Sequence, residues 1–260
     1  MYIDRGIHCF LKRDKEMKTA VVIPARYASS RFPGKPLYLI NNKPLILHVV
    51  SKVSKCRGID CVAVATDDKR IFDVVKSAGY NVFMTPVNLK SGTDRVAYVA
   101  NKYLKNYNVF VNVQCDEPLI DKKLVEKMVE EFKKDRKLEY LTVAYKMKPT
   151  DDIANPNTVK VIFDKNHYAL YFSRYPIPFL RDEKNKNKAE YYKHIGVYGY
   201  TKKFVCDFTK SKQTKLEITE SLEQLRALEQ GKKIKVIISS KDLQDVNVVE
   251  DVAKVNKALK

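Results

Sequence analysis

The sequence predicts an α/β fold with one mostly parallel, twisted sheet and helices on both of its faces. In the first half of the chain, short apolar runs alternate with longer segments whose apolar residues recur at helical spacing. The apolar runs are continuous, which is typical of parallel strands buried on both faces. This strand–helix order favours a parallel sheet, because parallel neighbours need a crossover helix between them.

Local signals support each element of the first half. Apolar residues between 44 and 55 lie near helical spacing, and two short polar segments, 66–68 and 91–94, provide the Ser, Thr and Asp side chains that begin helices. The predicted elements are, in order, strand 20–23, helix 44–55, strand 61–65, a helix after 68, strand 81–84, helix 91–104, strand 109–113 and helix 121–134.

The second half is less regular. Its polar stretch 181–192 is interpreted as a flexible insertion, and Gly231 is a left-handed stop for the amphipathic helix before it. No internal repeat or composition shift marks a linker, so we expect a single domain with a smaller embedded α+β subregion at about 145–215. The predicted elements are strands 140–146, 159–163, 169–173, 195–200 and 234–238, helix 219–230 and a final helix 248–259.

The composition excludes several classes of protein. A formal charge of +18 is compatible with nucleic-acid binding, but the lysines are spread along the chain and favour a solvated exterior with an anionic small-molecule substrate. The five cysteines form no C-x-x-C pair, which argues against zinc and fits a reducing cytoplasm. No apolar window is long enough to span a membrane, and residues 1–18 lack the apolar core of a signal peptide.

The loop after the first strand carries the strongest chemical signal. Arg26, Arg31 and Lys35 lie there beside Ser29 and other small residues, although the spacing is not that of a Walker loop. Guanidinium groups bind phosphate oxygens as a fork, and a lysine adds a compact charge. A basic surface loop is the alternative, but three cations directly after a strand favour a polyphosphate site.

Two further segments lie at predicted strand ends. Asp116 and Glu117 follow the strand 109–113, where ligands bind in open α/β sheets, and Asp116 is a candidate Mg²⁺ ligand. A plain strand-to-helix turn explains the same residues. Arg95 lies one turn into the helix that begins at 91, close enough to reach an anion at that helix's start, although capping alone explains the segment.

The second half adds three candidate substrate-binding residues. Arg174 follows a predicted strand, where it can pair with a carboxylate, while His194 and Tyr198 can bind hydroxyl groups. Ordinary packing of a lone His or Tyr is the competing interpretation.

Taken together, the chain from about Thr19 onward resembles the 3-deoxy-manno-octulosonate cytidylyltransferases, or CMP-Kdo synthetases. Seven phrases carry the resemblance in the family's order: I-P-A-R-Y-A-S-S-R-F-P-G-K-P-L, S-G-T-D-R, V-N-V-Q-C-D-E-P, N-P-N-T-V-K-V, A-L-Y-F-S-R, H-I-G-V-Y-G-Y and L-E-Q-L-R-A-L-E-Q-G. The resemblance implies a nucleotide-diphospho-sugar transferase-like fold over 19–260, with 1–18 as an N-terminal extension. The middle subregion would form the sugar site and the contact of a homodimer.

The resemblance also implies a reaction and its residues. The anomeric hydroxyl of a 2-keto-3-deoxy sugar acid would attack the α-phosphorus of CTP, with Mg²⁺ assisting, to give the CMP-sugar and pyrophosphate. The chain would bind no nucleic acid. By motif, the catalytic residues would be Arg26, Lys35 and Asp116; the nucleotide would bind Arg26, Ser29, Arg31, Lys35 and Gln114; the sugar would bind Arg95, Arg174, His194, Tyr198, Glu223 and Gln224; and the metal would bind Asp116 and Asn247.

Two positions depart from the family pattern. Cys115 stands where glycine is usual, and its side chain is expected to crowd the backbone near the nucleotide. Asn247 stands where the family has the second metal-binding aspartate, so Mg²⁺ is expected to bind more weakly; Asn247 remains a good N-cap, with Glu250 three residues later. Three hypotheses follow: an active enzyme in which Asn247 is tolerated or compensated by Asp245, a relative that uses an amino-octulosonate or nonulosonate, and a non-catalytic nucleotide-binding homologue.

Overall fold

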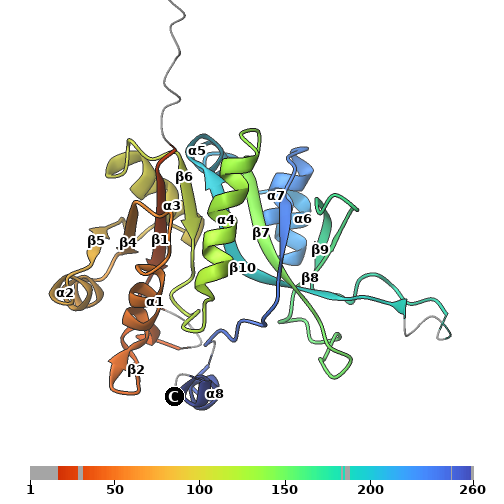
Figure 1. The fold of residues 1–260 in the computed structure, drawn as a ribbon, viewed down its shortest axis with the longest axis horizontal. Helices are drawn as coiled ribbons and strands as arrows, with labels where there is room; N and C mark the ends of the chain where they lie inside the picture. The colour runs from red at the N-terminus through yellow and green to blue at the C-terminus, as the bar shows by residue number, and fades with distance from the viewer. Residues whose placement is uncertain (1–16, 29–31, 183, 185–187, 247, 259–260) are drawn as a thin grey trace, which may run out of the picture.

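A computed structural model describes residues 17–28, 32–182, 184, 188–246 and 248–258. Within these residues a nine-stranded sheet forms the centre of the molecule, and seven of its strands follow the order β11-β7-β10-β6-β1-β4-β5 (Figure 1). These strands are β1 (Thr19–Ala25), β4 (Cys61–Thr66), β5 (Asn81–Met84), β6 (Val109–Asn112), β7 (Tyr140–Lys146), β10 (Tyr192–Thr201) and β11 (Lys235–Ser239).

The sheet confirms the predicted mostly parallel α/β architecture. β1 lies parallel to both β4 and β6, β4 lies parallel to β5, and β7 lies parallel to β11. β10 is the exception, because it runs antiparallel between β6 and β7. Off this path, β8 (Lys160–Phe163) and β9 (Ala169–Ser173) form a hairpin beside β10, within the predicted subregion.

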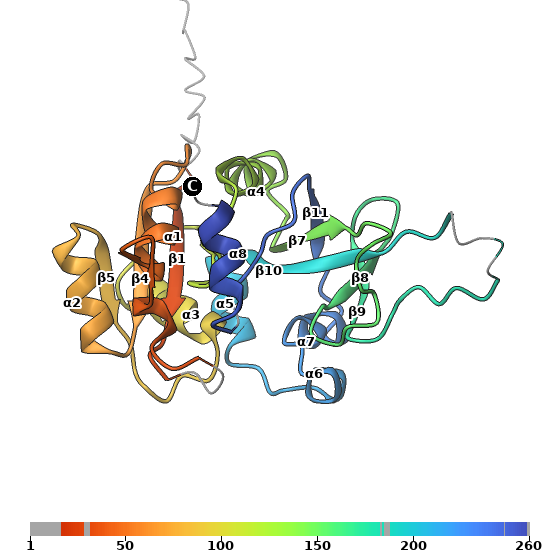
Figure 2. The same cartoon turned by 90° about the horizontal axis from the view of Figure 1, so that it is seen from below.

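Helices cover both faces of the sheet, as the continuous apolar strands require (Figure 2). Along β1, Val21 and Ile23 pack in one apolar cluster, whereas Ala20 and Val22 pack in the other. The first cluster includes α1 (Leu45–Val53), α2 (Lys69–Ser77) and α4 (Lys122–Lys134); the second includes α3 (Gly92–Lys102), α5 (Lys202–Phe208) and α7 (Gln224–Glu229).

The C-terminal segment returns to the loop after β1. Val246 and residues of α8 (Asp251–Ala258) pack with Phe32 and with residues 40 and 45 in a third apolar cluster. Next to this cluster are the short elements η1 (Lys35–Leu37), β2 (Leu39–Ile40) and β3 (Lys43–Pro44). Packing thus brings residues near both ends of the described chain to the carboxyl ends of β1 and β6.

One predicted helix is wrong in its limits. Instead of a single helix over 219–230, the chain forms α6 (Lys215–Glu220) and α7, separated at Ser221, which has the left-handed φ of 52°. At the start of α6 the Thr214 N–H donates to the Glu217 carboxylate at 3.2 Å, and at its end the guanidinium of Arg174 binds the carbonyl oxygens of Glu220 and Ser221. Because these carbonyl oxygens accept hydrogen bonds from Arg174, they do not accept the backbone hydrogen bonds that would continue the helix.

The helix α5 was not predicted, because its seven residues give too short a period to recognise. The last helix begins at Asp251 rather than 248, and Val248–Glu250 form a turn before it. Gly231 does have the expected left-handed φ, at 72°. Within the described chain no helix is both long and apolar enough to span a membrane.

Candidate active site

Two neighbouring cavities lie at the carboxyl ends of the central strands. The β1 cavity, of about 210 Å³, is lined by Pro24, Ala25, Arg26, Lys35, residues 89–92, Arg95 and residues 114–116. The β10 cavity, of about 460 Å³, is lined by Glu117, residues 155 and 157–159, residues 193–196 and 198, residues 221–224, Leu243, Asp245 and Asp251. Asp116 lines the first and Glu117 the second, so the end of β6 separates them.

A closed loop brings Arg26 and Lys35 to the β1 cavity. The N–H of Gly34 donates to the carbonyl of Tyr27 at 2.9 Å, which joins the two ends of the loop. Gly34 has a φ of 72°, and a Cβ there would lie 3.0 Å from the Tyr27 ring, so only glycine fits without strain. Ser29 and Arg31 lie outside the described residues.

Lys35 is one of the cations that line this cavity. Its Nζ donates to Asp116 Oδ2 at 2.5 Å and to the carbonyl oxygen of Val246 at 2.8 Å. The N–H of Val246 in turn donates to the Asp116 carbonyl at 2.9 Å, which fixes the C-terminal segment beside β6. A carboxylate oxygen and a carbonyl oxygen thus share one positive charge, in an environment that suits a hard cation.

Other acidic groups lie close to Asp116. The Glu117 carboxyl is buried and its Oε2 has no hydrogen-bond partner among the described residues. Burial, followed by the charges of Asp116 and Asp245, raises the pKa of Glu117 well above its ordinary value. Asn247 lies outside the described residues, and among those that are described no three His, Cys, Asp or Glu side chains are grouped to hold a metal ion.

Cys115 lines the β1 cavity with Gln114, as its place in the motif predicts. Burial, with the Asp116 charge as a second cause, raises the pKa of the Cys115 thiol to about 12. The thiol is therefore neutral at pH 7, and it packs in part against the apolar cluster on the α1 face.

Four of the predicted sugar-site residues gather in the β10 cavity: His194, Tyr198, Glu223 and Gln224. His194 and Tyr198 come from β10, and Glu223 and Gln224 follow the break at Ser221. Gln224 is 1% exposed and its Nε2 has no partner among the described residues. Buried polar groups without partners at a cavity wall indicate a polar ligand.

Arg95 and Arg174 lie elsewhere. Arg95 lines the β1 cavity rather than the β10 cavity, and its guanidinium donates to Asp67 Oδ2 at 2.6 Å and to Thr85 Oγ1 at 2.5 Å. Arg174 is not among the lining residues of either cavity. Its guanidinium instead donates to three backbone carbonyls, those of Pro156, Glu220 and Ser221, and so braces two walls of the β10 cavity.

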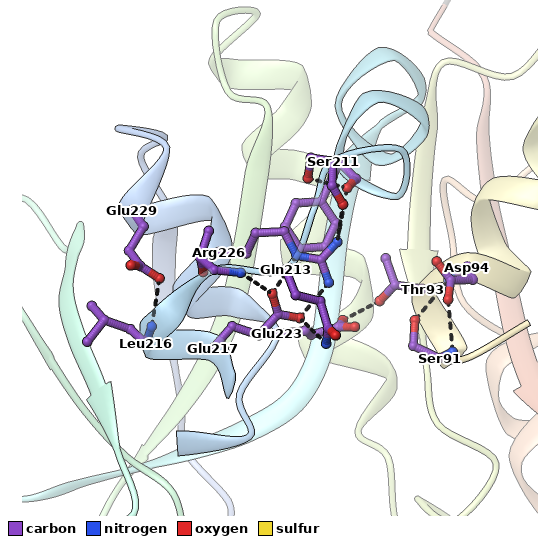
Figure 3. Close-up of polar contacts among 12 residues, drawn as sticks. Ser91, Thr93, Asp94, Ser211, Gln213, Leu216, Glu217, Glu223, Arg226 and Glu229 are labelled. Carbon is purple, nitrogen blue, oxygen red and sulfur yellow. Dashed lines mark hydrogen bonds and ion pairs between the residues drawn. The ribbon is translucent and has the colours of Figure 1, made fainter. Parts of the chain in front are cut away.

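Figure 3 shows how the α6–α7 segment is attached to the rest of the molecule. The Thr93 hydroxyl, in the first turn of α3, donates to the Glu223 carboxylate. On the other side, Arg226 binds both oxygens of Glu217, at 2.8 and 2.5 Å, and Gln213 donates to the same carboxylate at 3.3 Å. This buried ion pair fixes the helices that present Glu223 and Gln224 to the cavity.

Sequence reasoning assigned no role to several lining residues of the β10 cavity, among them Glu117 and Lys193. Glu117 was predicted to follow a strand at the edge where ligands bind but was given no role, and Lys193 was not considered, although it directly precedes His194. Lys193 is the one Lys or Arg that lines this cavity among the described residues; its Nζ donates to Asp242 Oδ1 at 2.9 Å and to the Leu243 carbonyl at 3.3 Å. The signal that could have identified Lys193 is a basic residue next to a candidate hydroxyl-binding histidine.

Comparisons with known proteins identify the family of this chain. The family model described as "Cytidylyltransferase" matches residues 20–234. The 3-deoxy-manno-octulosonate cytidylyltransferase 2 of Hydrogenovibrio crunogenus is 48% identical over 91% of this chain and 96% of its own length. The 8-amino-3,8-dideoxy-manno-octulosonate cytidylyltransferase of Shewanella frigidimarina is 46% identical over 92% of this chain and 97% of its own length.

A solved structure gives the same assignment. The structure of CMP:2-keto-3-deoxy-manno-octonic acid synthetase complexed with CTP superposes with a TM-score of 0.87 at 37% identity, and it covers 93% of this chain and 98% of that one. With the family model, the curated relatives and this structure in agreement, the chain belongs to the cytidylyltransferase family, whose members are enzymes.

Proposed function

We propose that this enzyme transfers CMP from CTP to the anomeric hydroxyl of 3-deoxy-manno-octulosonate or a close 2-keto sugar acid. The anomeric hydroxyl loses its proton to solvent as its oxygen bonds to the α-phosphorus, the bond from that phosphorus to the oxygen it shares with the β-phosphorus breaks, and pyrophosphate leaves. The observation that carries the proposal is the pair of cavities that meet at Asp116 and Glu117. One presents cations, and the other presents hydroxyl-binding groups.

Each cavity is assigned by its chemistry. In the β1 cavity, Arg26 and Lys35 would bind the triphosphate, and their charge offsets the charge that develops on its oxygens. In the β10 cavity, His194, Tyr198, Glu223 and Gln224 would bind the sugar hydroxyls. Cys115 and Gln114 would lie beside the nucleotide, and Arg95 and Arg174 would hold the walls in place.

Mg²⁺ is part of the proposal. The donors fit it in part: the Asp116 carboxylate and the Val246 carbonyl already share the Lys35 ammonium, and Asn247 follows in the chain. Mg²⁺ bound there would stabilise the charge on the phosphate oxygens and lower the pKa of the attacking hydroxyl. With Asn in place of Asp at position 247, one carboxylate fewer is available to the metal.

The enzyme is further proposed to work as a homodimer in the cytoplasm. Leu170, Tyr175 and Phe179 are 59%, 72% and 79% exposed on β9 and the segment after it, which extends away from the main sheet (Figure 2). Exposed apolar side chains gathered on one arm favour a contact with a second copy.

The experiment that tests the function is pyrophosphate release from CTP. We expect release only when Mg²⁺ and a 2-keto-3-deoxy sugar acid are both present, and none after chelation of Mg²⁺. A panel that contains the 8-hydroxy and the 8-amino octulosonates and a nonulosonate separates the first hypothesis from the second. Retained CTP binding with no turnover on any sugar would contradict the proposal.

Lys193 provides a sharper prediction about the sugar. A 2-keto sugar acid brings a carboxylate, and Lys193 is the cation that lines its cavity in the described residues. We expect Lys193→Met to raise the KM for the sugar acid by roughly 10-fold or more, since a hydrogen bond to a charged group contributes about 1.5–3 kcal/mol. The KM for CTP is expected to stay unchanged, and Lys193→Arg to retain most of the affinity. An equal rise in both KM values would contradict a specific role.

A further inference from the structure

A chain of hydrogen bonds joins His194 on β10 to the backbone through Thr142 on β7. Thr142 is completely buried. Its Oγ1 lies 2.9 Å from His194 Nε2 and 3.0 Å from the carbonyl oxygen of Val197. The β7–β10 register shifts between Ile195 and Tyr198, so this contact lies at an irregularity of the sheet.

The number of hydrogens on each group fixes the direction of these hydrogen bonds. A hydroxyl has one hydrogen and a carbonyl oxygen only accepts, so the Thr142 hydroxyl donates to Val197. The second carbonyl in reach, that of Ile195 at 3.5 Å, requires the same direction. Oγ1 therefore accepts from His194, and Nε2 of the ring carries a hydrogen.

The other ring nitrogen is then an acceptor. Burial lowers the pKa of His194 to about 3, so the ring is neutral at pH 7 and carries a single N–H. With the hydrogen on Nε2, Nδ1 keeps its lone pair. No described residue binds Nδ1, and this atom is not among the fully enclosed polar atoms that lack a partner. The ring lines the β10 cavity, so Nδ1 is accessible from it.

Neighbouring rings hold the imidazole in place. Phe172 meets it edge-on at 5.0 Å between ring centroids, and Tyr198 lies at 5.5 Å. Both ring contacts and the Thr142 hydrogen bond restrict rotation of the imidazole. The cavity is thus presented with an acceptor of fixed position.

We propose that Thr142 is a positioning residue that selects the Nε2–H tautomer of His194, so that Nδ1 accepts a hydrogen bond from the sugar acid. The sugar group that donates to Nδ1 must carry a hydrogen, so it is a hydroxyl or an amino group. The carboxylate of the sugar acid carries no hydrogen and cannot donate to Nδ1, so it must lie elsewhere in the cavity. The identity of the ligand rests on the proposed function, whereas the tautomer rests on the protein alone.

The tautomer is measured by long-range ¹H–¹⁵N correlation NMR on the ¹⁵N-labelled full chain without ligands, with the His194 signals assigned from their loss in His194→Gln. We expect a protonated Nε2 and an unprotonated Nδ1 in the wild type and in Thr142→Ser, and a mixture of tautomers in Thr142→Val. An Nδ1–H tautomer in the wild type or in Thr142→Ser overturns the proposal, even if the valine variant does not fold.

Kinetics separate this role from a purely structural one. For Thr142→Val we expect the KM for the sugar acid to rise about tenfold, the value of one hydrogen bond, with the KM for CTP unchanged. Thr142→Ser is expected to restore the wild-type value. A valine variant with wild-type sugar KM overturns the proposal. Absence of turnover with every sugar would contradict the proposed function and leave the NMR result to decide the tautomer.

Discussion

Replacement of Lys35 by methionine is expected to lower kcat by about 10²–10³-fold, because loss of one preorganised charge-stabilising donor in an active site has effects of this size. Lys35 Nζ is within 2.8 Å of both Asp116 Oδ2 and the Val246 carbonyl, at the wall of the cationic cavity. The measurement is pyrophosphate release at saturating CTP and sugar acid. Because the cation also attracts the triphosphate, the KM for CTP is expected to rise.

Lys202→Met is the matched control. Lys202 Nζ likewise donates to a backbone carbonyl, that of Lys105 at 2.8 Å, but it lines neither the β1 nor the β10 cavity. Its kinetics are expected to match those of the wild type. A Lys35→Met enzyme with kcat and CTP KM within twofold of the wild type would contradict a role in catalysis.

A Mg²⁺ titration separates Lys35 from Asp116. If Asp116 binds the metal, Asp116→Asn raises the Mg²⁺ concentration for half-maximal rate, because an amide oxygen carries no charge to attract the ion. Lys35→Met is expected to leave that concentration unchanged or lower it, since the ammonium competes for the same carboxylate oxygen. An unchanged Mg²⁺ curve for Asp116→Asn would exclude this carboxylate as a ligand.

Replacement of Arg226 by methionine is expected to have the largest effect on stability, about 3–5 kcal/mol, because it leaves the Glu217 carboxylate buried without its partner. The two side chains are only 11% and 5% exposed. The guanidinium also lies 4.4 Å from the centre of the Phe208 ring and donates to the carbonyls of Phe208 and Ser211. Denaturant unfolding measures the change.

Two further variants test the reason for this loss. Arg57→Met removes an ion pair of 3.4 Å to Glu126 in which the arginine is 91% exposed, and its effect is expected to stay within about 0.5 kcal/mol. Adding Glu217→Gln to Arg226→Met is expected to recover part of the stability, because no charge is then buried alone. An Arg226→Met protein as stable as Arg57→Met would contradict the assignment.

The same ion pair gives a pH dependence. Burial alone would raise the pKa of Glu217, but hydrogen bonds from Arg226 and Gln213 leave it below the ordinary value of 4.5. A carboxyl whose pKa is lowered by folding stabilises the native state above pH 4.5, and the contribution is lost as the pH falls through the native pKa. The stability difference between wild type and Arg226→Met is therefore expected to shrink as the pH falls below 4.5 and through the native pKa of Glu217.

Most strands and helices could be predicted from the sequence, because their signals are local. The apolar runs of β1 and β6 and the polar starts of α2 and α3 are each contained in a few consecutive residues. The polyphosphate loop could be recognised for the same reason, since Arg26 and Lys35 lie in one continuous segment. The helix predicted over 219–230 was wrong because a distant residue, Arg174, binds the carbonyls at the break.

Folding alone shows which side chains meet. Lys35 contacts Asp116 across 81 positions of sequence and Val246 across 211, and Thr142 contacts His194 across 52. Arg174 and Arg95 carry the right charge for an anion, yet backbone carbonyls and Asp67 engage them. A residue type and its local pattern determine what a side chain can bind. Only packing decides which partner it contacts, because contacts between distant segments leave no periodic pattern in the sequence.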